Sequence, residues 1–204
     1  MDTRLSKGLW GLAAFLSVGI ALFSYRYLGP PNVTESPQIL ANLFARPWLL
    51  VHVAGAATAL LVGGFQFLPA VRRRRMLHRW LGRTYATGCI VGGAGGFVMA
   101  FGSTAGPVAT VGFALLAPIW IYCTVQGWLT VRMRRFEEHR AWMIRSFALT
   151  FAAVTLRLYL PIGQMAGMPF ETIYPLTAWI SWIPNLLLAE LYLRRGPARR
   201  AAVA

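Results

Sequence analysis

Acidic residues and lysine are scarce in this chain. Its 204 residues include 6 Asp and Glu against 20 Lys and Arg, and Lys7 is the single lysine. Only 13% of the residues are charged, whereas about a quarter are charged in a typical soluble domain. The scarcity of charge therefore argues against a soluble domain. It also leaves no pair of carboxylates inside an apolar segment to relay protons.

Familiar catalytic motifs and cysteine pairs are missing too. The sequence has no HExxH, CxxC, G-x-S-x-G or P-loop motif, so a hydrolytic enzyme is disfavoured. Cys89 and Cys123 both fall in apolar segments, where free cysteine behaves as a small hydrophobic residue. We expect no disulfide framework.

Long apolar segments are abundant. Apolar residues make up 57% of the chain and gather in six blocks, at residues 9–28, 47–70, 84–102, 107–131, 146–166 and 172–193. A helix needs about 20 mostly apolar residues to cross a membrane. The first block resembles a signal peptide, but its core is long and no A-x-A-like cleavage site follows it. We therefore predict an all-α fold, a bundle of six transmembrane helices with an uncleaved first helix.

The net charge of +14 reflects topology rather than a nucleic-acid site. Of the 20 basic residues, 17 lie at the N-terminus, in the segments 72–83 and 132–145, and in the tail. Since cytoplasmic loops are rich in Lys and Arg, we expect both termini in the cytoplasm of a bacterium and the protein in its inner membrane. Residues 1–46 would form the first helix and an external loop, 47–193 the bundle core with helices two to six, and 194–204 a basic cytoplasmic tail.

Two segments of the chain resemble each other. Residues 66–87 (QFLPAVRRRRMLHRWLGRTYAT) and 126–149 (QGWLTVRMRRFEEHRAWMIRSFAL) are identical at 10 of 22 aligned positions, with gaps at Glu137 and Ala141. The repetition indicates a duplicated helix–basic loop–helix unit. Each unit holds two spans, so both copies have the same orientation. We predict a four-helix core made of two parallel helix-hairpin repeats, related by about 180° around the membrane normal.

Small residues recur every four positions in the third block, at Gly88, Gly92, Gly96 and Ala100. They share one helical face, and such a face lets another helix backbone approach closely. We expect the third helix at the centre of the bundle.

Polar residues gather near the cytoplasmic ends of the spans. This inner polar layer comprises Gln66, His78, Arg83, Gln126, His139, Arg145, Asn185 and Glu190. Convergent arginine and amide groups can bind a carboxylate, a phosphate or a quinone carbonyl. The alternative is pairing between helices, with Glu190 neutralising Arg83 or Arg145 and the other arginines meeting anionic lipid head groups.

A smaller outer polar site is predicted from His52, Arg157 and Glu171. An arginine in the outer half of a span should face the bundle interior and meet a polar partner. We expect Glu171, Tyr159 or His52 to be that partner. Pro161 also frees the backbone carbonyl of Arg157, because proline has no N–H to donate to the residue four positions earlier.

Three strings, LHRWLGR (77–83), EHRAWMIRSFALTFAAVTLRLYLP (138–161) and WIPNLLLAE (182–190), resemble an uncharacterised bacterial multi-pass membrane family, domain-of-unknown-function family 2306. The likeness covers roughly residues 47–193. It implies an integral membrane protein and supplies no activity.

The sequence favours a membrane protein that binds a small anionic or amphipathic ligand, such as a quinone or lipid head group, in the inner polar layer. One alternative is a redox subunit with b-type haem on His78 and His139, since such a haem needs two facing imidazoles. Another is a non-catalytic accessory or assembly protein whose polar residues serve packing. A metal held by two histidines alone would lack ligands, so we predict no metal site.

Overall fold

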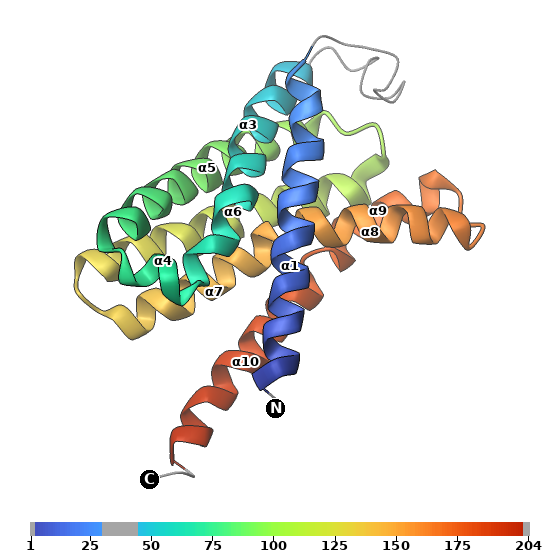
Figure 1. Ribbon diagram of the computed structural model, residues 1–204. Helices are drawn as coiled ribbons and strands as arrows, with labels where there is room; N and C mark the ends of the chain where they lie inside the picture. The colour runs from blue at the N-terminus through green and yellow to red at the C-terminus, as the bar shows by residue number, and fades with distance from the viewer. Residues whose placement is uncertain (1–2, 30–44, 202–204) are drawn as a thin grey trace.

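The computed structural model describes residues 3–29 and 45–201, and every regular element in these ranges is helical (Figure 1). The longer helices are α1 (Thr3–Ser24), α3 (Ala45–Gly63), α5 (Arg75–Phe101), α6 (Gly106–Arg132), α7 (Phe136–Thr150), α8 (Ala152–Met165), α9 (Phe170–Ile180) and α10 (Ile183–Ala201). The short helix η1 (Tyr25–Leu28) follows α1, while η2 (Gly64–Phe67) and α4 (Pro69–Arg73) connect α3 to α5. The predicted all-α fold is confirmed.

Within the described residues, six helical segments are long and apolar enough to cross a membrane, as predicted. They are Gly8–Leu28, Arg46–Phe67, Arg75–Phe101, Gly106–Arg132, Phe136–Met165 and Phe170–Arg195. The third and fifth begin 9 and 10 residues before the expected starts at 84 and 146. The segments 72–83 and 132–145, expected as loops, are therefore mostly helical. Arginine, leucine and methionine are good helix formers, so these helices begin before the first residue of each apolar block.

The expected division of the chain differs at its edges. Most of the expected external loop lies outside the described residues. Helix α10 continues to Ala201, so the residues expected as a separate tail prolong the last helix.

The closest helix contact is between α3 and α5, through glycine. A Cβ added to Gly92 would lie 2.6 Å from the backbone nitrogen of Ala56, and one added to Gly88 would lie 2.8 Å from the carbonyl oxygen of Gly55. No side chain fits there, so the two backbones touch. The predicted role of the glycine face is confirmed, and α5 also packs against α6, placing it between two neighbours.

Two of the spans are interrupted. The fifth is divided at Phe151 into α7 and α8, and the sixth at Ser181 and Trp182 into α9 and α10. Pro184, the second residue of α10, cannot donate to the carbonyl of Ile180, so the second interruption follows from its missing N–H. After it, α10 leaves the direction of α9 and runs toward the same end of the molecule as the start of α1 (Figure 1). The relation of the two hairpins by a rotation of about 180° stays a prediction.

Candidate functional site

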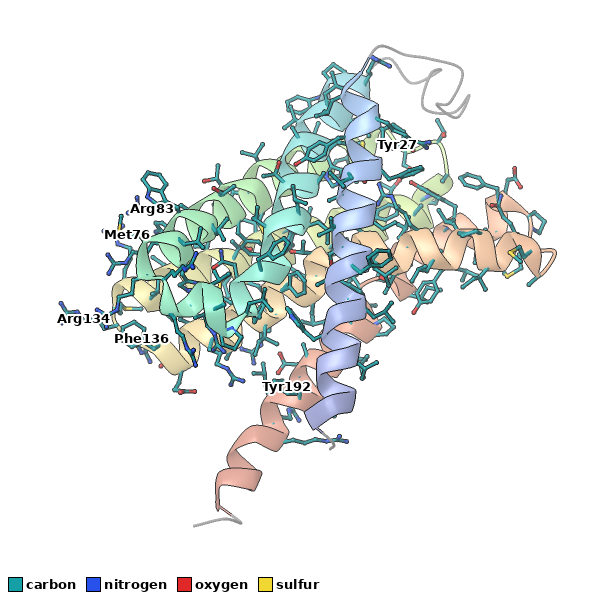
Figure 2. All side chains as sticks on the ribbon, in the orientation of Figure 1. Tyr27, Met76, Arg83, Arg134, Phe136 and Tyr192 are labelled. Carbon is teal, nitrogen blue, oxygen red and sulfur yellow. The ribbon has the colours of Figure 1, made fainter. Side chains whose placement is uncertain are left out.

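The repeated segments form two bends, which we call the first elbow (residues 66–79) and the second elbow (residues 126–140). Figure 2 shows Met76 and Arg83, which lie in or near the first elbow, at the same end of the molecule as Arg134 and Phe136 of the second, whereas Tyr27 lies well away from them. The two elbows are thus neighbours in space as well as relatives in sequence.

The first elbow is bent by a proline. Helix α3 passes into η2, Leu68 is extended with ψ 130°, and Pro69 begins the short helix α4. A residue before proline is driven out of the helical region by the proline ring, which explains the break at Leu68. In the second elbow α6 runs without a break to Arg132. Arg134 there adopts the left-handed conformation, with φ 60°.

The backbone of the two elbows becomes equivalent at the start of the following helix. Arg74 precedes α5 with φ −89° and ψ 83°, and Arg135 precedes α7 with φ −87° and ψ 72°. The N–H of His78 donates to Arg74 O at 3.0 Å, and that of His139 to Arg135 O at 2.9 Å. The structure therefore pairs Arg74 with Arg135. The extra residue of the second copy lies before Arg135, and the gap that we placed at Glu137 was wrong.

His78 and His139 occupy equivalent positions in the two copies but have different partners. The Nδ1 atom of His139 hydrogen-bonds Gly127 O at 2.8 Å. The Nδ1 atom of His78 is buried and has no hydrogen-bond partner among the described residues. The two imidazoles lie close enough for their charges to interact, as the repeat predicted.

The two glutamines also differ. Gln66 is buried, with 8% of its surface exposed, and its Nε2 has no partner in the described part of the chain. Its Oε1 lies 3.7 Å from the position that a Cβ on Gly82 would take. Gln126 is only partly buried, on α6. The two amides therefore lie in different surroundings.

The arginines Arg83 and Arg145 do not converge on one cavity. Arg145 forms a bidentate ion pair with Glu190: its Nε contacts Oε1, and its Nη2 lies 3.0 Å from Oε2. Arg83 is exposed and stacks at 5.1 Å on Trp80, with no hydrogen bond or ion pair to any described residue. The expectation of a single shared site for Gln66, Gln126 and both arginines is wrong, because α10 reaches Arg145 and not Arg83.

Asn185 belongs to the packing of α10. Its Nδ2 donates to Ser181 O at 2.8 Å, to Thr155 Oγ1 at 3.2 Å and to Ala148 O at 3.3 Å. Since Asn185 and Glu190 both hold α10 against the fifth span, the Asn185–Glu190 part of the inner layer matches the packing interpretation.

Arg83 instead lines a groove of about 510 Å³ between α5 and α6. The other lining residues are Ala86, Thr87, Ile90, Thr124, Val125 and Trp128. Most of this wall is apolar, and the guanidinium of Arg83 is its one charged group. We call it the α5–α6 groove. It can accept an apolar chain or ring whose polar end lies beside Arg83.

The outer polar residues do not form the predicted site. His52 Nδ1 hydrogen-bonds Gly92 O at 2.7 Å, so this histidine belongs to the α3–α5 contact. Arg157 is partly buried and donates from Nη1 to Ala153 O of its own helix at 3.1 Å. Among the described residues it makes no hydrogen bond or ion pair with Glu171, Tyr159 or His52. Glu171 is exposed on the first turn of α9, so it is not the partner of Arg157, whereas His52 lies close enough to Arg157 for their charges to interact.

Comparison with known proteins places the chain in a family. One family profile, described as a predicted membrane protein (DUF2306), matches residues 49–193. The chain belongs to the DUF2306 family. No curated protein and no solved structure matches it. The match includes both elbows and the α5–α6 groove, so the resemblance inferred from the three sequence strings is confirmed.

In this DUF2306 protein the bundle centre holds a hydroxyl cluster that sequence analysis missed. Tyr85 Oη lies 2.8 Å from both Ser146 Oγ and Thr150 Oγ1, and Trp120 Nε1 donates to Thr150 Oγ1 at 2.9 Å. Thr124 Oγ1 joins Ser146 Oγ at 2.7 Å. These bonds tie α5, α6 and α7 together. The i,i+4 spacings of Ser146 with Thr150 and of Trp120 with Thr124 were the available signal.

The described residues contain no group of three or more His, Cys, Asp or Glu that could hold a metal ion. Cys89 and Cys123 are free and buried.

Proposed function

We propose that this protein binds an amphipathic molecule with an anionic or carbonyl-bearing head, such as a lipid or a quinone, in the α5–α6 groove. The observation that supports this proposal is the position of Arg83 at the polar end of an otherwise mostly apolar groove. Its planar guanidinium can hold a carboxylate or phosphate with two parallel hydrogen bonds. Trp128 offers a flat surface for a ring or an alkyl chain.

The proposed location is the inner membrane of a bacterium, with both elbows and both termini in the cytoplasm. It rests on the basic residues of the elbows and the chain ends. Single cysteines at positions 134 and 104 test it in intact cells, in a background lacking Cys89 and Cys123. A membrane-impermeant thiol reagent should label position 104 and leave position 134 unlabelled. Labelling of position 134 from outside would reverse the topology.

Binding is tested on the purified full-length chain with two probes, oleate and decylubiquinone, by thermal shift and native mass spectrometry. Wild type should bind at least one probe. R83Q should bind it roughly tenfold more weakly or worse, since a hydrogen bond to a charged group is lost. R83K should fall between them, because lysine keeps the charge and lacks the planar fork.

The matched control is R79Q, which removes an exposed arginine one turn earlier that does not line the groove. It should bind like wild type. Equal weakening of binding in R79Q and R83Q would show that binding depends on net charge alone. That result would reject the groove as the binding site. Response to oleate alone indicates an acidic lipid, and response to decylubiquinone alone indicates a quinone.

A second candidate function, b-type haem on His78 and His139, is favoured by one observation. The Nδ1 bond of His139 to Gly127 O leaves its Nε2 free, which is the usual arrangement of a ligating histidine. An optical spectrum of protein expressed with added haem precursor tests it. A Soret band that H78A and H139A both abolish would support haem, and its absence would leave the ligand proposal or an accessory role.

A further inference from the structure

The first elbow contains two buried polar atoms without a partner, Gln66 Nε2 and His78 Nδ1. The other such atoms in the described residues are the hydroxyls of Ser17 and Ser181. A serine hydroxyl on a helix can turn toward a carbonyl of its own helix. The amide of Gln66 and the ring of His78 do not have this local alternative, so each needs another hydrogen-bond partner.

Both residues lie at the first turns of α5. The side chain of Gln66 packs beside Gly82 of α5, with Oε1 3.7 Å from the position of an added Cβ. His78 lies four residues before Gly82 and so on the same face of the helix. Glycine leaves room there that any other residue would fill. Gln66 and His78 therefore both lie along the first turns of α5, on the face beside Gly82.

Roughly 90% or more of buried backbone polar groups, and the large majority of buried side-chain polar atoms, have a hydrogen-bond partner in native proteins, and an exception calls for an explanation such as a bound ion. The charge of the surrounding side chains indicates the sign of the charge that this place would bind. The segment 66–87 contains six arginines and no acidic residue. The arginines are Arg72, Arg73, Arg74, Arg75, Arg79 and Arg83, all exposed. A cluster of positively charged side chains raises the local concentration of anions.

The second elbow shows what the first lacks. There the Nδ1 atom of His139 hydrogen-bonds Gly127 O, and Glu138 forms an ion pair with Arg135 at 2.6 Å. The second copy thus supplies its own acceptors. The first supplies none for Gln66 and His78.

We propose that the first elbow binds an oxyanion, a phosphate or a carboxylate, with one oxygen accepting hydrogen bonds from Gln66 Nε2 and from His78 Nδ1–H. The site is separate from the α5–α6 groove, whose lining includes neither residue. The oxyanion belongs either to a lipid head group of the cytoplasmic leaflet or to a small soluble anion.

The test uses the full chain in nanodiscs of phosphatidylcholine, alone, with inorganic phosphate, or with phosphatidylglycerol, and reads the unfolding temperature. Wild type should rise by several degrees with phosphate or with phosphatidylglycerol, since a ligand that binds the native state stabilises it. Q66L and H78F should lose this rise. A response to phosphate in plain phosphatidylcholine identifies a soluble anion, and a response to phosphatidylglycerol alone identifies a lipid.

The matched control is Q126L, the same change at the equivalent position of the second copy, which should keep the rise. Q66L in plain phosphatidylcholine should unfold at or above the wild-type temperature, because leucine removes an unpaired buried amide. That result also shows that the variant folds. The groove proposal is tested with R83Q and R79Q, and this one with Q66L, H78F and Q126L, so failure of the groove proposal leaves this one standing.

Absence of any anion response in wild type would overturn the site. Equal loss in Q66L and Q126L would overturn it too. So would a wild-type response that Q66L and H78F both retain, since the anion would then bind the surface arginines alone.

Discussion

The second elbow satisfies its polar groups within the chain, whereas the first leaves two of them unpaired. His139 bonds Gly127 O and Arg135 pairs with Glu138, while His78 Nδ1 and Gln66 Nε2 have no partner in the described residues. Few residues account for the difference. Pro69 stands where the second copy has Leu129, and the first copy has Met76 and Leu77 where the second has Glu137 and Glu138.

The two copies also differ in how their arginines are held. In the second copy the ion pair of Arg145 with Glu190 holds α10 to α7. In the first copy Arg83 faces the α5–α6 groove without such a pair. The two arginines thus have different neighbours, because a single additional helix reaches only one of them.

The largest expected difference concerns the helix contacts of the two hairpins. G92A should lower the free energy of unfolding by about 3 kcal/mol, because its Cβ would meet the backbone of Ala56 at 2.6 Å. G127A should cost less than about 1 kcal/mol, because its Cβ would meet the flexible end of Met143, also at 2.6 Å. Unfolding in detergent measures both. Equal costs would show that the hairpins pack alike.

Removal of the arginines should give the next largest difference. R145A should cost about 2 kcal/mol, less than the loss of a fully buried pair, because the Arg145 and Glu190 side chains are 23% and 30% exposed. R83A should cost less than about 0.5 kcal/mol, as an exposed side chain without an ion pair to any described residue does. The double variant R145M/E190L should recover most of the loss. A cost for R83A as large as that for R145A would mean that Arg83 also serves packing.

The smallest effect is expected for E138Q, which makes the second elbow more like the first. The pair of Glu138 with Arg135 is exposed, at 46% and 56% of the two side chains. Such pairs contribute about 0–1 kcal/mol, so the unfolding temperature should hardly change. The anion response of the nanodisc experiment should also stay unchanged. An increased response in E138Q would show that the glutamate keeps anions away from the second elbow.

Sequence alone was sufficient for the spans and for the close approach of another helix to the glycine face of α5. Apolar length and glycine spacing are properties of one short segment, and neither needs knowledge of distant residues. The helix starts at Arg75 and Phe136 were missed, because hydropathy ends where the arginines begin although the helix does not.

Tertiary structure decided which polar residues meet. Sequence could place Arg83, Arg145 and Glu190 in one layer, but it could not say which arginine Glu190 would reach. That choice depends on the turn at Ser181 and Trp182, which sets the direction of α10. The partner of His52, the hydroxyl cluster around Tyr85 and the unpaired nitrogens of the first elbow likewise depend on rotations of whole helices. Depth in a membrane follows from position along the chain, whereas contact across a bundle follows from how all its helices pack together.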